Sequence, residues 1–190
     1  MPHFKEVLAA TLAYEGGYVN DPFDRGGETY RGISRKHHPN WPGWTRIDQR
    51  VYSRAKLEAD PALIAAVEEF YRAYYWAPIG GEDIDDRALA GALFDCAVSL
   101  GVTRTVGFLQ RSLNALSQNA SLSGYVEVDR VYGPASARAL KTQLAAKGAA
   151  ALIKAVEGLR TVHYLNLIDH DPTQARFAYT WLARVGRQAA

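Results

Sequence analysis

Glu15 and Asp24 are two carboxylates that the sequence places nine residues apart, and Thr29 follows them closely. A glutamic acid that stays protonated near neutral pH can donate its proton to a leaving sugar oxygen, as glycoside hydrolysis requires. A second carboxylate can activate the attacking water, and a threonine hydroxyl can hold that water in place. The set predicts acid and base chemistry, with Glu15 as the acid and Asp24 and Thr29 guiding water.

The residues before Glu15 predict that its side chain is sheltered from water. Phe4, Leu8, Thr11 and Glu15 follow one another at steps of four, three and four, so a helix over residues 2–15 would place them on one face. The glycine pair that follows would stop the helix. Burial and the helix macrodipole at its carboxyl end would both raise the pKa of Glu15. The alternative is that Glu15 only hydrogen-bonds a neighbouring loop.

The helical period is lost between residues 18 and 34, where turn-forming residues separate short pieces that can form strands. This pattern predicts a loop with a small, irregular hairpin directly after the first helix. Such an excursion could bring Asp24 back to the same cleft as Glu15. Asp21 and Asp24 could instead be turn-forming aspartates that cap their own loop. Asp24 is the preferred catalytic candidate, and Asp21 is held in reserve.

Residues around this loop are candidates for substrate binding. Flat aromatic rings can stack on the C–H faces of a sugar, although aromatic side chains at helical spacing more often belong to the core. We expect Phe70 and Phe94 to be buried in the core. A glycine allows the backbone to approach a bound sugar closely. The candidate substrate-binding residues are Tyr18, Asn20, Asp21, Gly27, Tyr30 and Trp76.

The rest of the chain predicts helices. Asp60-Pro61 is typical of a helix start, and Pro78 would end that helix. Thr103 could cap another helix, which carries apolar residues as far as residue 116. The remaining predicted helices span 86–100, 134–147, 149–169 and 172–185, whereas 35–58 has no clear pattern. The predicted fold class is mainly α, with a small β-hairpin or irregular loop insert after the first helix.

The composition excludes several classes of protein. The 190 residues, 48% of them hydrophobic, suffice for one compact domain or two packed halves. The 22 basic and 20 acidic side chains are scattered, which argues against a nucleic-acid binder. The single cysteine, Cys96, lies among apolar residues, so we expect a buried, inert thiol. The histidines lack metal-ligand spacing, and we predict no metal and no cofactor.

Several motifs resemble those of glycoside hydrolase family 108. The first runs from Glu15-Gly16-Gly17-Tyr18 through Asp24, Gly26-Gly27 and Thr29 to Gly32-Ile33-Ser34. The resemblance continues in 70–78 and 93–101. Residues 129–134 and 177–185 are similar to the peptidoglycan-binding module that accompanies the family. The match covers nearly the whole chain, and its first motif is specific.

The resemblance implies a lysozyme-like helical fold and an N-acetylmuramidase. Such an enzyme cuts the β-1,4 bond between N-acetylmuramic acid and N-acetylglucosamine, with Glu15 as the catalytic glutamate. Residues 1–100 would form the catalytic region. Residues 101–190 would form a helical peptidoglycan-binding region, packed against the first as one compact unit. Peptidoglycan is then the expected partner, and no nucleic acid is expected.

Three positions depart from the family pattern. Glu28 stands where a small or neutral residue is expected, so its charge could perturb Glu15 or contact substrate. Ser99 replaces an expected asparagine, which could alter a hydrogen bond. Arg130 replaces an expected turn glycine, which affects the loop geometry. None of the three removes the predicted acid.

The first residues lack the charged and apolar segments of a signal peptide, and no apolar run is long enough to span a membrane. We therefore expect synthesis in the cytoplasm without a signal peptide, no membrane insertion, and action in the periplasm or cell wall. Export through a phage holin or a dedicated secretion system would fit. The alternative function is a non-catalytic peptidoglycan-binding or assembly protein, against which the set Glu15, Asp24 and Thr29 argues.

Overall fold

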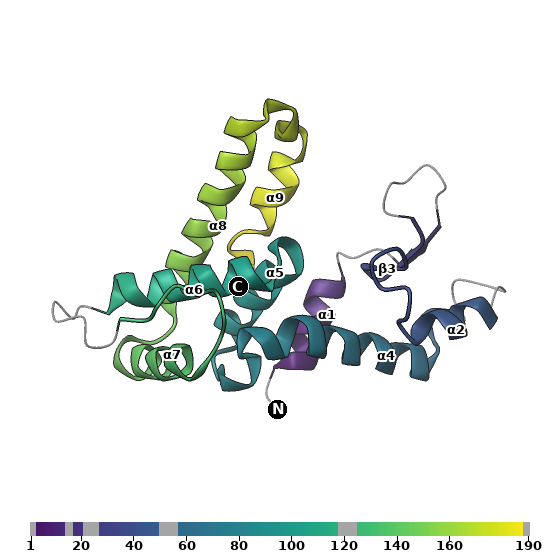
Figure 1. Ribbon diagram of the computed structural model, residues 1–190, viewed down its shortest axis with the longest axis horizontal. Coiled ribbons are helices and arrows are strands. Elements are labelled where there is room, and N and C mark those ends of the chain that lie inside the picture. Colours follow the sequence, from purple (N-terminus) through teal and green to yellow (C-terminus); the bar gives the residue numbers. More distant parts are fainter. Residues whose placement is uncertain (1–2, 14–16, 21–26, 50–56, 118–124, 188–190) are drawn as a thin grey trace. The chain divides into compact units, whose positions relative to one another are not determined.

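The computed structural model describes residues 3–13, 17–20, 27–49, 57–117 and 125–187 (Figure 1). The chain divides into two compact units. The N-terminal unit is Phe4–Tyr74, and the C-terminal unit is Tyr75–Ala190 together with Met1–His3. Glu15, Asp21 and Asp24 lie outside the described residues.

The N-terminal unit contains three helices and a small sheet among its described residues. Its elements are α1 (Phe4–Leu12), β1 (Tyr18–Val19), β2 (Thr29–Tyr30), β3 (Ile33–Ser34), α2 (Gly43–Gln49) and α4 (Pro61–Tyr71). The strands form an antiparallel sheet in the order β1-β2-β3. The sheet follows α1 directly in the chain, which confirms the predicted insert after the first helix.

Helix α4 begins as its sequence predicts. The Asp60 carboxylate accepts hydrogen bonds from the backbone N–H groups of Ala62 and Leu63, and Pro61 occupies the first turn. Arg46 of α2 donates to the same carboxylate at 3.0 Å, which holds the pKa of Asp60 below its ordinary value. The α-helix ends at Tyr71 and continues as a short π-helix, η1 (Arg72–Trp76).

The C-terminal unit is helical throughout its regular elements. These are η2 (Ala77–Ile79), η3 (Gly81–Asp83), α5 (Arg87–Leu100), α6 (Val102–Leu116), α7 (Pro134–Lys147), α8 (Ala150–His170), η4 (Pro172–Phe177) and α9 (Ala178–Arg184). Helix α5 is buried from Leu89 to Ala97 and packs against α6 and α8. Helix α9 returns alongside α8 (Figure 1). The mainly α fold class is therefore confirmed.

Two helix predictions need correction. Helix α6 begins at Val102 after Gly101, which has φ +87, so Thr103 does not cap it. The helix predicted over 172–185 starts as the 3-10 turn η4, because Asp171 accepts from the Thr173 N–H and fixes a tight first turn. Regular α-helix begins only at Ala178.

A buried ion cluster holds α5, α8 and α9 together. Asp95 of α5 accepts from Arg160 of α8 at 2.7 Å and from Arg184 of α9 at 2.8 Å. The Arg160 side chain is fully buried. Burial by itself lowers the pKa of Arg160, but Asp95 and Tyr164 more than offset that effect and raise it. We call these residues, with Ser99, the Asp95 cluster.

Candidate active site

Helix α1 presents the buried face that the sequence predicts. Phe4, Leu8 and Thr11 are at most 4% exposed. The helix ends at Leu12, and Ala13 still donates its backbone N–H to Ala9. Glu15 comes three residues after the end of α1 and three before the start of β1. The predicted shelter of its carboxyl lies outside the described residues and stays a prediction.

The sheet brings the two ends of the Asp24-bearing loop together. Tyr18 pairs with Tyr30, and Val19 pairs with Thr29. Between β2 and β3, Arg31 at φ +45 and Gly32 at φ +79 form a two-residue turn, a geometry that suits the twist of a hairpin. The chain that leaves β1 and the chain that enters β2 are therefore adjacent.

Two tyrosines anchor this hairpin to the helical part of the N-terminal unit. The Tyr71 hydroxyl, from the end of α4, donates to the Arg31 carbonyl at 2.8 Å. The Tyr30 hydroxyl donates to the Leu57 carbonyl at 3.3 Å. Because both bonds come from buried rings, the strand that carries Thr29 has a fixed position within its unit.

Thr29 is half-buried at the start of β2. Its hydroxyl donates to the Gly27 carbonyl at 3.1 Å, so the oxygen lone pairs remain able to accept a hydrogen bond from a water molecule. Gly27 has φ +67, a conformation that glycine adopts without strain. Asn20 is exposed at the end of β1. These positions are compatible with a polar cleft, and the roles predicted for the three residues stay predictions.

Glu28 belongs to a chain of polar contacts across the sheet. It accepts from the Tyr18 hydroxyl at 3.0 Å and pairs with Arg35 at 2.8 Å. Arg35 also pairs with Asp48 at 2.6 Å and lies over the Trp44 ring. Burial and the hydrogen bond to Glu28 raise the pKa of the Tyr18 hydroxyl.

Glu28, whose charge departs from the family pattern, therefore has a cationic partner in Arg35, the residue that follows β3. Arg35 was not among the residues predicted from the sequence. It faces Glu28 because the pairing of β2 with β3 brings them together, and its backbone N–H donates to the Glu28 carbonyl at 2.8 Å.

The rings of Tyr30 and Trp76 are both fully buried, so neither offers an open face for sugar stacking. Their predicted substrate-binding roles stay predictions. Tyr30 stacks on Trp41 in the core of the N-terminal unit, with ring centroids 6.2 Å apart. Trp76 packs against Phe94 in the C-terminal unit and donates its indole N–H to Glu82. The burial predicted for Phe70, Phe94 and Cys96 is confirmed.

The other two departures from the family pattern are accommodated in the C-terminal unit. The Ser99 hydroxyl donates to the Asp95 carbonyl at 2.8 Å and accepts from Arg160 at 3.0 Å, so it is part of the Asp95 cluster. Arg130 has φ +65, the left-handed conformation expected of a turn glycine. Its backbone N–H donates to Gln110 at 2.8 Å, which stabilises the turn.

Neither a metal cluster nor a membrane span was found in the described part of the chain. There, no three His, Cys, Asp or Glu side chains come together as a metal site would require. In the same ranges, every helix is too short or too polar to cross a bilayer.

A mainly helical protein with a small antiparallel sheet after its first helix, and with acidic residues at that junction, has the architecture of a lysozyme-like hydrolase. The profile of the glycosyl hydrolase 108 family matches residues 8–101, and the profile of a predicted peptidoglycan domain matches residues 104–186. The N-terminal part of the chain thus belongs to the glycosyl hydrolase 108 family, and the peptidoglycan domain follows it. The protein is therefore a glycoside hydrolase that acts on peptidoglycan, at the cell wall.

Among solved structures, the chain is similar to SagA of Brucella abortus. The two share 25% sequence identity with a TM-score of 0.62, over 97% of this chain and 90% of that one. A search of curated proteins found no match.

Proposed function

We propose that this protein is an N-acetylmuramidase, which hydrolyses the β-1,4 bond between N-acetylmuramic acid and N-acetylglucosamine. The observation that carries the proposal is the junction of α1 with the sheet. The buried face of Phe4, Leu8 and Thr11 leads along the helix toward Glu15, and the sheet begins three residues beyond it. In this proposal, the Glu15 carboxyl continues the buried face of the helix on one side and meets the substrate on the other.

In the proposed reaction, the Glu15 carboxylic acid donates its proton to the glycosidic oxygen as the bond from that oxygen to the sugar C1 breaks. A water molecule attacks C1, and the Asp24 carboxylate accepts the proton that the water loses. Thr29 positions this water through the free lone pairs of its hydroxyl. Each cut consumes one water and creates one reducing end.

Analysis of the products tests the bond specificity. Purified peptidoglycan is digested, reduced with borohydride and examined by mass spectrometry. A muramidase yields muramitol at every new end. Glucosaminitol would contradict the proposed bond, and a 1,6-anhydro end without a reducing group would contradict hydrolysis by water. Binding to peptidoglycan with no new ends would support the alternative, a non-catalytic wall-binding protein.

Substitutions of Thr29 test the proposed guidance of water. Thr29→Ser keeps the hydroxyl and should retain most activity, whereas Thr29→Val keeps the shape and should lower kcat with little effect on KM. Equal activity of the two variants would contradict the role of the hydroxyl.

The division of the chain into a catalytic region, residues 1–100, and a peptidoglycan-binding region, residues 101–190, stays a prediction. Delivery through a holin or a secretion system also stays a prediction.

A further inference from the structure

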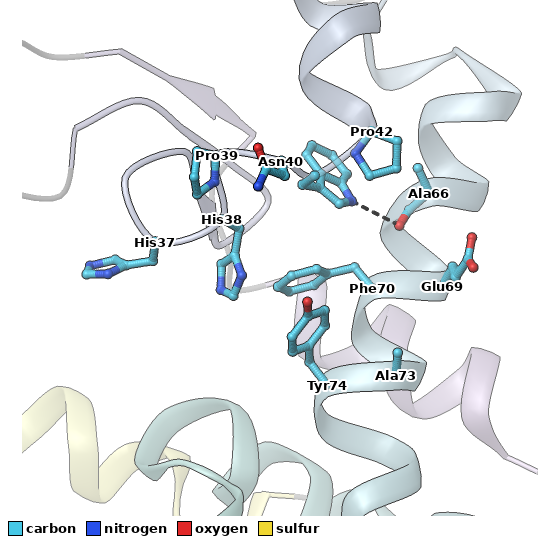
Figure 2. A pocket seen from close by; sticks show the side chains of 11 residues that line it. His37, His38, Pro39, Asn40, Pro42, Ala66, Glu69, Phe70, Ala73 and Tyr74 are labelled. Atoms are coloured by element: carbon cyan, nitrogen blue, oxygen red, sulfur yellow. Dashed lines mark hydrogen bonds between the residues drawn. The ribbon is translucent and has the colours of Figure 1, made fainter.

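A cavity of about 370 Å³ lies within the N-terminal unit, between the loop of residues 37–42 and one face of α4 (Figure 2). Its size falls in the range of roughly 300–1,000 Å³ that small-molecule sites occupy. Thr29, the one residue proposed for catalysis that the structure describes, is not among the described residues that line it. His37, His38 and Asn40 contribute from the loop. Phe70 contributes from α4, and Tyr74 contributes from η1, which continues it.

The walls of this cavity are fixed by hydrogen bonds. The Trp41 indole N–H donates to the Ala66 carbonyl of α4 at 3.3 Å, which ties the loop to the helix (Figure 2). The Trp44 indole N–H donates to the His38 carbonyl at 2.7 Å, and the His38 N–H donates to the Ser34 carbonyl at 2.9 Å. A preformed site of this kind spends little binding free energy on ordering its own residues.

The cavity contains an aromatic platform that is supported from behind. The Tyr74 ring lies against Phe70, with centroids 4.6 Å apart and a tilt of 31°. The His38 ring meets both of them edge-on, at 4.7 and 5.3 Å. Tyr74 is 56% exposed, whereas Phe70 is buried. An exposed ring that rests on a buried one offers a flat, electron-rich face to the C–H groups of a sugar.

The charges around the cavity favour a neutral sugar. Among the described residues that line it there is no lysine or arginine, and Glu69 is the one carboxylate. Burial, followed by the charge of His37, lowers the pKa of His38, so the His38 ring is mostly neutral near pH 7. Asn40 is exposed at the rim, where its amide can both donate and accept. Muramic acid brings a peptide with carboxylates, which a site without cations disfavours, whereas N-acetylglucosamine is uncharged.

We propose that this cavity binds one N-acetylglucosamine residue of the glycan strand, at a site separate from the bond that is cut. The inference rests on the proposed function, because it takes the strand as the ligand. The sugar ring stacks on Tyr74, and its acetamido and hydroxyl groups face Asn40 and His38. Holding the strand at a second point would lower KM for polymeric substrate without changing kcat.

Calorimetric titration with chitotetraose, a neutral oligomer of N-acetylglucosamine, tests the cavity directly. Tyr74→Ala should raise Kd about tenfold or more, and Tyr74→Phe should retain most of the affinity because it keeps the ring. Asn40→Ala, on an exposed loop position, is a second variant that does not disturb the helix and should weaken binding severalfold. Thr45→Ala, an exposed position of α2 outside the cavity, is the matched control and should bind within twofold of the wild type.

Wild-type affinity in both Tyr74→Ala and Asn40→Ala would overturn the proposal, as would no binding of chitotetraose to the wild type. Muramyl dipeptide should compete poorly, and competition equal to that of chitotetraose would contradict the selection for a neutral sugar. The proposed function is judged separately by release of reducing ends. A wild type that binds chitotetraose in the cavity yet releases none would refute the muramidase assignment and leave the binding site standing.

Discussion

Removing the Asp95 carboxylate should destabilise the C-terminal unit strongly. Asp95 is 3% exposed and neutralises Arg160, which is fully buried, at 2.7 Å. In Asp95→Ala the guanidinium keeps hydroxyl contacts to Ser99 and Tyr164 but loses its closest anion, and the next one, Glu157, is 3.5 Å away. Breaking such a buried pair from one side costs about 3–5 kcal/mol. For a chain of this size, that corresponds to a fall in Tm of roughly 6–20 °C.

The assay is thermal unfolding followed by circular dichroism. Asp169→Ala, an exposed position on α8, is the control and should change the free energy of unfolding by less than about 0.5 kcal/mol. The double variant Asp95→Leu with Arg160→Met should lose less stability than Asp95→Leu alone, because the fully buried Arg160 guanidinium is then removed together with its closest anion. A loss below about 1 kcal/mol for Asp95→Ala would refute the reasoning.

This cluster also has a place in the organisation of the chain. Asp95 lies in the part that matches the hydrolase profile, whereas Arg160 and Arg184 lie in the part that matches the peptidoglycan domain. The ion pairs therefore link the end of one family region to two helices of the other, within one compact unit.

Three further predictions follow from local geometry. Arg130 has φ +65, so Arg130→Gly should be neutral or stabilising by up to about 1 kcal/mol, whereas Arg130→Val should be destabilising. Unfolding in denaturant measures both variants, and a Val variant more stable than the Gly variant would contradict this prediction. Burial lowers the pKa values of His38 and His163, so the unfolded chain binds more protons than the folded one below about pH 6.5. Tm should therefore decrease as the pH is lowered from 7.5 to 5.5, and a Tm that stayed constant or increased would argue against these half-buried, neutral rings. Burial raises the pKa of Cys96 to about 11, so a thiol reagent should modify it only after unfolding in urea; rapid modification of the folded protein would contradict its burial.

The helices could be predicted well where local signals agree. Asp60 and Pro61 start α4, and the Asp86 carboxylate accepts from the Leu89 N–H at the start of α5, as expected of capping residues. Helices α7 and α8 fall within one residue of their predicted bounds. The requirement for a left-handed turn at Arg130 could also be anticipated, because a glycine was expected there.

The face on which an aromatic side chain lies could not be predicted in the same way. Tyr30 flanks the candidate catalytic loop and was expected to meet substrate, but the long-range bond from its hydroxyl to Leu57 turns it inward. Trp76 belongs to the π-helix η1, where the spacing of an α-helix no longer gives the direction of its side chain. The cavity beside Tyr74 likewise depends on the bond from Trp41 to Ala66, which joins residues 25 positions apart, and no local pattern contains that information.

Reducing-end release by Glu15→Gln tests the central claim most directly. The variant keeps the size of the side chain but cannot donate the required proton, so the rate on purified peptidoglycan should fall by about 10²–10⁴ while circular dichroism and Tm remain those of the wild type. Glu6→Gln, an exposed position on α1, should remain fully active. A folded Glu15→Gln protein that retained more than a tenth of the wild-type rate would contradict the assignment of Glu15 as the acid.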